Sequence, residues 1–162
     1  MKIDNKDSYD RLRGQLVIAI FIVATLISIS MFYDFFTIYF IPISGSTYAF
    51  IFGGLLLLYI IYRNGLKYHF IIYDDESDKI ILRYYPQSSF LTKYTSIEIP
   101  FNSLYKIEIT RAFFNQREEL TIHQTVKKGV AKYKPIPLTA LSNKQKKDLL
   151  NALNSHAKVK MQ

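Results

Sequence analysis

The sequence contains no cysteine, and it has few glycines and prolines for its length. Only 6 glycines and 5 prolines occur among 162 residues. The absence of cysteine excludes a disulfide scaffold, thiol chemistry and zinc sites built on thiolates. With 49% hydrophobic residues the chain is too apolar for an intrinsically disordered protein, and it has no glycine repeat of the collagen kind.

Charge is also missing from one long part of the chain. Between Gly14 and Tyr62 the only charged residue is Asp34, and a single soluble domain does not segregate its charges in this way. The uncharged run from Gly14 to Tyr33 is long enough for a helix of roughly 30 Å, the thickness of the hydrocarbon core of a bilayer. A second apolar run ends at Tyr62.

The two runs predict a transmembrane helical hairpin over residues 14–66, with spans at about 14–35 and 46–63 and a tight connection near Ile41 to Ser46. A cleaved signal peptide has a shorter apolar core and a small-residue cleavage site, whereas this chain continues into MFYDFF after Ser30. A helix of a soluble protein rarely stays apolar on every face over this length. One re-entrant segment is the remaining alternative, and the length of the second run favours two spans.

Positive charge flanks the hairpin on one side only. Cations precede the first span and follow the second, whereas the connecting segment contains no Lys or Arg. The positive-inside rule therefore predicts a multi-pass protein with both termini in the cytoplasm. The flanking cations are Lys2, Lys6, Arg11, Arg13, Arg63 and Lys67.

Small residues recur four positions apart in each span. Ala24 and Ser28 form one such pair, and Ala49 and Gly53 form the other. Small residues at this spacing let membrane helices approach closely. The pairs either pack the hairpin on itself, which we favour, or mediate oligomerisation or docking onto a larger membrane complex.

The chain changes character after Lys67. Segments of alternating, β-branched or aromatic residues predict about six antiparallel strands in a cytoplasmic domain over 67–157. A capping box, Ser142 with Gln145, then begins an amphipathic helix that places Leu149 and Leu153 on one face. Residues 1–13 are expected to be a cytoplasmic N-terminal segment and residues 158–162 a tail. The predicted strands lie at 68–73, 79–85, 97–101, 105–110, 120–126 and 130–138.

Two stretches carry a resemblance to a known family. They are IEIPFNSLYKIEIT (Ile97–Thr110), a hydrophobic strand that turns into a second strand, and PLTALSNKQKKDLLNAL (Pro137–Leu153), a terminal helix with a polar start. With the preceding hairpin, the chain resembles the membrane-anchored bacterial PH-like domain proteins of the YcxB-like kind. The resemblance implies an α+β membrane protein of the bacterial inner (cytoplasmic) membrane: a transmembrane hairpin, then a small antiparallel β (PH-like) domain with a C-terminal amphipathic helix.

Positive charge dominates the second half of the chain. Residues 80–162 contain 14 Lys and Arg against 5 Asp and Glu. Four lysines surround one predicted hairpin, and they either contact anionic lipid or form an ordinary solvated surface. The turn from Asp74 to Asp78 is acidic instead, which argues against phosphoinositide recognition of the eukaryotic PH type. The four lysines are Lys127, Lys128, Lys132 and Lys134.

Motifs that would indicate an enzyme are missing. His69, His123 and His156 are isolated in the sequence, with no carboxylate at ligand or triad spacing. There is no glycine-rich phosphate loop and no nucleic-acid-binding motif. We therefore expect no catalytic residue, no cofactor, no metal site, no nucleic-acid partner and no small-molecule substrate. Phe113 and Phe114, in the loop RAFFNQRE, are either an exposed docking point for a partner or part of the core.

These features predict a non-enzymatic accessory or scaffold protein of the inner membrane. Its partners would be membrane lipids and one or more proteins of a larger membrane complex, reached through the PH-like domain. One alternative is a module that responds to anionic lipid through the four lysines. Another is a small subunit of a transporter or enzyme complex whose active residues lie on other chains.

Overall fold

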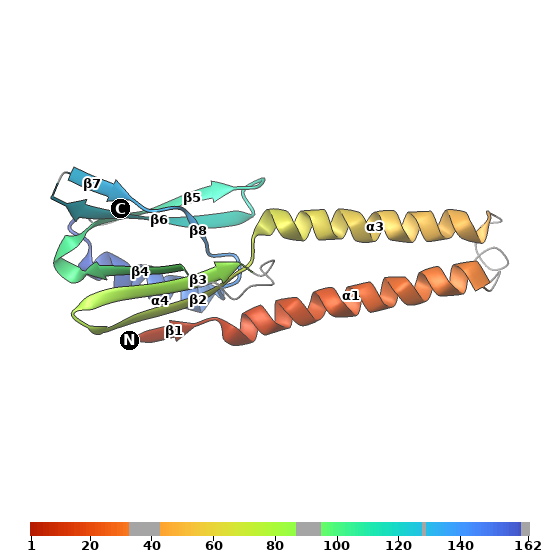
Figure 1. The fold of residues 1–162 in the computed structure, drawn as a ribbon, viewed down its shortest axis with the longest axis horizontal. Coiled ribbons are helices and arrows are strands. Elements are labelled where there is room, and N and C mark those ends of the chain that lie inside the picture. Colours follow the sequence, from red (N-terminus) through yellow and green to blue (C-terminus); the bar gives the residue numbers. More distant parts are fainter. Residues whose placement is uncertain (33–42, 87–94, 128, 160–162) are drawn as a thin grey trace. The chain divides into compact units, whose positions relative to one another are not determined.

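The computed structural model describes the chain except for residues 33–42, 87–94, 128 and 160–162. It is an α+β structure with two long apolar helices and antiparallel sheets (Figure 1). The chain divides into two compact units. The β unit comprises Met1–Asp10 and Leu66–Gln162, and the helical unit comprises Arg11–Gly65.

Two helices account for the apolar runs. They are α1 (Lys6–Phe32) and α3 (Gly45–Leu66), and both are long and apolar enough to cross a membrane. The prediction of two long apolar helices is confirmed. Helix α1 begins earlier than the predicted span, within the charged segment, because a helix is not limited to the apolar residues that reveal it.

The two helices contact each other at both ends of the helical unit. A Cβ added to Gly45 would lie 1.9 Å from the carbonyl oxygen of Ser30, so only glycine fits there. Toward the other end, Arg63 Nη2 donates to the carbonyl of Leu12 at 2.8 Å, and its Nη1 donates to the Tyr59 hydroxyl at 3.1 Å. The Gly45–Ser30 and Arg63–Leu12 contacts join the two helices, whereas the Arg63–Tyr59 hydrogen bond lies within α3.

The first sheet of the β unit contains the N-terminal residues. It has the order β1 (Lys2–Asp4), β2 (His69–Ser77), β3 (Lys79–Pro86), β4 (Thr95–Pro100), with antiparallel pairing throughout. Residues 1–13 were expected to be a cytoplasmic N-terminal segment, and within them the structure has β1, which pairs with β2 through Ile3 and Tyr73. A three-residue strand is too short to show alternation, and its partner follows only after both long helices.

The second sheet is built around β6 (Arg117–Val126), which pairs with β5 (Leu104–Ala112), β7 (Gly129–Lys132) and β8 (Ile136–Pro137). A short 3-10 helix, η1 (Phe101–Ser103), precedes β5. The sixth predicted strand is thus divided into β7 and β8. Lys158 and Val159, expected to lie in a tail, donate from their backbone N–H groups to the carbonyls of Leu104 and Tyr105.

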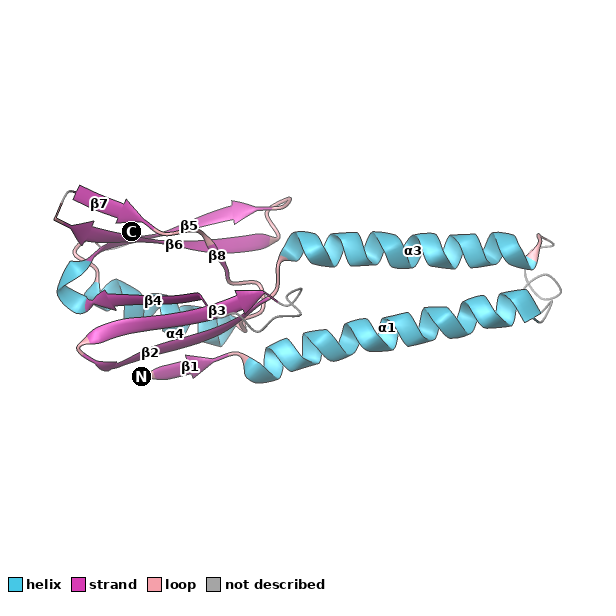
Figure 2. Ribbon diagram, in the orientation of Figure 1, coloured by secondary structure: helices cyan, strands magenta, loops and turns pink. Residues whose placement is uncertain are grey.

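One apolar core joins both sheets to the last helix, α4 (Asn143–His156) (Figure 2). Leu149 and Leu153 of α4 are completely buried, as their helical spacing predicts. The predicted capping box is present, with the Ser142 side chain accepting from the Gln145 N–H and the Gln145 side chain accepting from the Ser142 N–H. The core residues of the strands are Ile3, Ile71, Tyr73, Ile80, Leu82, Ile97, Ile99, Leu104, Ile107, Leu120, Ile122 and Ile136.

Candidate functional site

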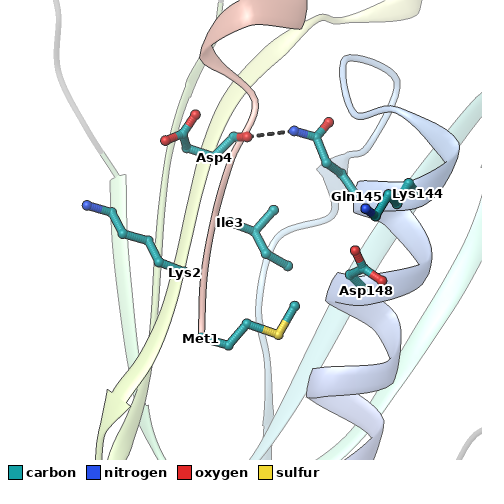
Figure 3. Close-up of a pocket in the computed structure, with 7 residues that line it drawn as sticks. All are labelled: Met1, Lys2, Ile3, Asp4, Lys144, Gln145 and Asp148. Carbon is teal, nitrogen blue, oxygen red and sulfur yellow. Dashed lines mark hydrogen bonds between the residues drawn. The ribbon is translucent and has the colours of Figure 1, made fainter.

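A groove of about 420 Å³ lies between β1 and the beginning of α4. Figure 3 shows the seven residues that line it, four from the N-terminal segment and three from the helix. The Gln145 amide nitrogen donates to the carbonyl of Asp4 at 2.6 Å and closes one end. The lining is mixed in charge, and it consists of Met1, Lys2, Ile3, Asp4, Lys144, Gln145 and Asp148.

Strand β1 lies at the edge of its sheet, because β2 is its only strand neighbour among the described residues. In an antiparallel edge strand, every second residue directs its backbone N–H and C=O away from the partner strand. The carbonyl of Asp4 that accepts from Gln145 is one of these outward groups. Lys2, two residues earlier, has the same orientation, so the groove offers its peptide groups as well as charged side chains. Sequence reasoning missed it, because β1 itself carries no readable signal.

Asn5 continues the pairing after β1 ends. Its side chain is buried, donates from Nδ2 to the carbonyl of His69 at 2.9 Å, and accepts from the backbone N–H of Ile71 at 2.8 Å. The side-chain amide thus replaces a peptide group in the ladder. One residue later α1 begins, and its Tyr9 ring packs edge-on against Phe70 at a centroid distance of 5.7 Å. These contacts hold the first turn of α1 on β2.

Phe113 and Phe114 form the turn between β5 and β6. Phe113, Phe114 and Asn115 have positive φ angles of 50°, 54° and 64°, and the N–H of Gln116 donates to the carbonyl of Phe113 at 3.1 Å. The Phe114 side chain is 88% exposed, whereas Phe113 is half-buried and meets it edge-on at 5.5 Å. The left-handed backbone, which residues other than glycine rarely adopt, holds the Phe114 ring away from the core.

Three of the four predicted lipid-contact lysines lie in or just after the β6–β7 hairpin. Lys127 lies in the turn after β6, Lys132 pairs with His123 at the end of β7, and Lys134 follows before β8. All three are exposed. Lys128 lies outside the described residues.

The small residues of the two helices are placed unequally. Ala49 and Gly53 are half-buried, whereas Ala24 and Ser28 are exposed. The Ser28 hydroxyl donates to the carbonyl of Ala24 within its own helix. In α1 another set of positions, spaced three and four apart, is half-buried, with Ser30 fully buried: Leu12, Leu16, Ala19, Val23, Leu26 and Ser30.

Folding brings two histidines to carboxylates that are distant in sequence. His123 Nε2 lies 3.2 Å from Glu108 across the strand pair, and His156 Nε2 lies 3.8 Å from Asp75 while its ring stacks on Phe101. Sequence spacing could not show these pairs, since they arise from strand register and helix docking. Within the described parts of the chain, no three His, Cys, Asp or Glu side chains gather as a metal site would require.

His69 stands at the beginning of β2. Burial lowers its pKa, and this outweighs the hydrogen bond between its Nδ1 and the carbonyl of Lys67, which raises it. The charges of Arg117 and Glu119 also reach the His69 ring, with opposite effects on its pKa.

No family model, curated protein or solved structure matches this chain.

Proposed function

We propose that this chain is a non-enzymatic accessory protein of a bacterial inner membrane, in which α1 and α3 cross the bilayer as a hairpin. The apolar side chains of both helices support insertion, because they point outward over most of their length. Phe21 of α1 is 76% exposed and Phe50 of α3 is 82% exposed. Such a surface is unfavourable in water but suited to lipid, where a helix satisfies its own backbone hydrogen bonds.

The proposed orientation places both termini in the cytoplasm. Its support is the cations that flank the hairpin on one side and the absence of Lys and Arg from residues 33–62. Because the chain has no cysteine, single cysteines provide a test without background. Cysteine at Ser46, at the beginning of α3, should react with an impermeant maleimide in intact cells. Cysteine at Ser155 should react only after permeabilisation, and the reverse pattern would refute the orientation.

The β unit is proposed to be PH-like. The resemblance implies antiparallel strands followed by a single helix that covers them, and the order from β1 to α4 agrees with that description. One apolar core that includes both sheets and the last helix is consistent with it as well. The hairpin would then be an insertion between the first two strands of the domain.

The proposed role is protein interaction within a larger membrane complex. The observation that carries it is the groove beside β1, where an edge strand with outward peptide groups faces α4. An extended segment of a partner could pair with β1 and place its side chains against the helix, which is the common mode of strand addition. The lysines and aspartates of the lining would then select the charge pattern of that segment.

The test is gentle detergent extraction of the native protein, separation by native size and mass spectrometry of what comigrates. We expect a stoichiometric companion. Lys144→Trp, which fills the groove, should release it. Lys147→Trp, on an exposed neighbouring position outside the lining, should retain it. A protein that migrates alone contradicts the accessory role, and equal retention by both variants removes the groove from the proposal.

A further inference from the structure

Four parts of the β unit meet at one end. Gln145 in the first turn of α4 donates to Asp4, the last residue of β1, and Lys146 Nζ donates to Glu118 at the beginning of β6 at 3.0 Å. The β5–β6 turn therefore lies at the end of the β unit where the chain continues from β1 into α1. The beginning of β2, which follows α3, lies at this same end (Figure 1).

The β6–β7 turn, which contains Lys127, lies at the opposite end of the β unit. Strand β6 separates the two turns, and its 10 residues extend over roughly 30 Å. Electrostatic attraction to a charged surface falls off over about 8 Å at physiological ionic strength. A membrane that contacts one of these turns therefore exerts little attraction on the other.

The end of the β unit that carries the β5–β6 turn has an exposed aromatic ring together with cations. Phe114 is the most exposed of the large apolar side chains in the described residues. Arg111, just before the turn, has a 66% exposed side chain, and Lys67, Lys144 and Lys147 are exposed as well. The nearby carboxylates are paired with cations: Glu118 lies 3.0 Å from Lys146 and 3.8 Å from Arg111, and Glu119 lies 2.8 Å from Arg117. Aromatic rings and cations together are typical of surfaces that lie at the interface of an anionic bilayer.

We propose that the β5–β6 turn is a membrane contact, with the Phe114 ring in the lipid interface and Arg111 against anionic headgroups. The occupant is the bilayer that holds α1 and α3, so the inference rests on the proposed membrane insertion. The covalent connections favour this occupant. Only Asn5 separates β1 from α1, and only Lys67 and Tyr68 separate α3 from β2. The end of the β unit that carries the turn thus cannot be far from the bilayer surface.

The test uses the full chain in nanodiscs of phosphatidylethanolamine and phosphatidylglycerol, with one fluorescent cysteine label at a time. Labels at Gln116→Cys and Thr125→Cys report the two ends of β6, and a label at Leu55→Cys reports the middle of α3. With nitroxide on the lipid headgroups, we expect quenching at 116 to exceed that at 125 by at least about threefold, because the ends are roughly 30 Å apart. Phe113→Ser/Phe114→Ser should reduce quenching at 116, because the turn then has no ring in the lipid interface.

The matched control is Val126→Ser/Val130→Ser, which removes two exposed apolar side chains at the other end. It should leave the quenching at 116 unchanged. Equal quenching at 116 and 125, with the label at 55 still quenched by nitroxide at the bilayer centre, overturns this inference and leaves membrane insertion intact. A label at 55 that is not quenched refutes the insertion itself. Low quenching at 116 together with loss of the comigrating companion in Phe113→Ser/Phe114→Ser would make the turn a protein-docking site instead.

Discussion

The β unit buries its apolar side chains, whereas the helical unit exposes the same residue types. In the β unit Leu82 and Leu120 have no exposed surface, whereas in the helical unit Leu58 is 63% exposed and Phe21 is 76% exposed. The β unit follows the rule for a protein that folds in water, with apolar side chains in the core. The helical unit resembles a surface whose solvent is itself apolar. The comparison teaches that burial within the chain indicates how much a leucine stabilises the β unit. It does not indicate this for the helical unit.

The sharpest test of this difference is a matched pair of leucine truncations. Leu82→Ala should lower the free energy of unfolding of the β unit by about 2–5 kcal/mol, because it leaves a cavity in a packed core. Leu58→Ala should leave that free energy unchanged. The free energies of both variants are measured by urea titration of the full chain in nanodiscs. Hydrogen exchange of peptides from β6 reports the unfolding. A comparable loss in the two variants would show that the exposed face of α3 supports the β unit.

A smaller loss of stability is expected at Asn5, which lies in the chain between β1 and α1. Asn5→Ala removes both hydrogen bonds that continue the β1–β2 pairing and leaves buried peptide groups without partners, which should cost about 1–3 kcal/mol. Exchange of the Ile71 amide should accelerate more than exchange in β6. Asn102→Ala, at an exposed position of η1, is the control and should change neither. An unaffected Ile71 amide would show that β1 does not depend on Asn5.

The capping box at the beginning of α4 should contribute less to stability than Asn5 does. Ser142→Ala removes the side chain that accepts from the Gln145 N–H, and the loss of such a cap costs about 1 kcal/mol. Ser155→Ala, at the other end of the same helix, is the matched control. Thermal unfolding of both variants in nanodiscs, followed by circular dichroism, provides the measurement. If the two variants lose equal stability, the capping box makes no specific contribution.

The smallest expected effect is a pH dependence from His69. Its folded-state pKa is lowered, chiefly by burial, so the folded protein binds fewer protons there than the unfolded chain. Its contribution to stability is therefore present above the unfolded pKa of about 6.5 and is lost as the pH falls toward the folded value. His69→Gln should weaken the decline in stability between about pH 7.5 and about pH 5.5. Urea midpoints at the two pH values measure this decline. If it is unchanged in His69→Gln, His69 is not its cause.

Local sequence signals predicted much of the fold. The apolar runs predicted two long helices, the alternating segments predicted β2 to β6, and Ser142 with Gln145 predicted the cap of α4. Strands of four residues or fewer did not give a sufficient signal. Strand β1 was missed for this reason, and residues 130–138 were read as one strand although β7 and β8 are separate. The candidate groove could not be predicted, because one of its two walls is β1.

By itself the sequence determined the apolar character and length of α1 and α3, the amphipathic face of α4 and the segregation of charge. Each of these depends on residues within a few turns of one another, so composition and periodicity contain it. Only the tertiary structure decided that Ile3 pairs with Tyr73 and that His123 lies beside Glu108. These depend on long-range register, which is selected by the packing of the whole core and not by any one segment.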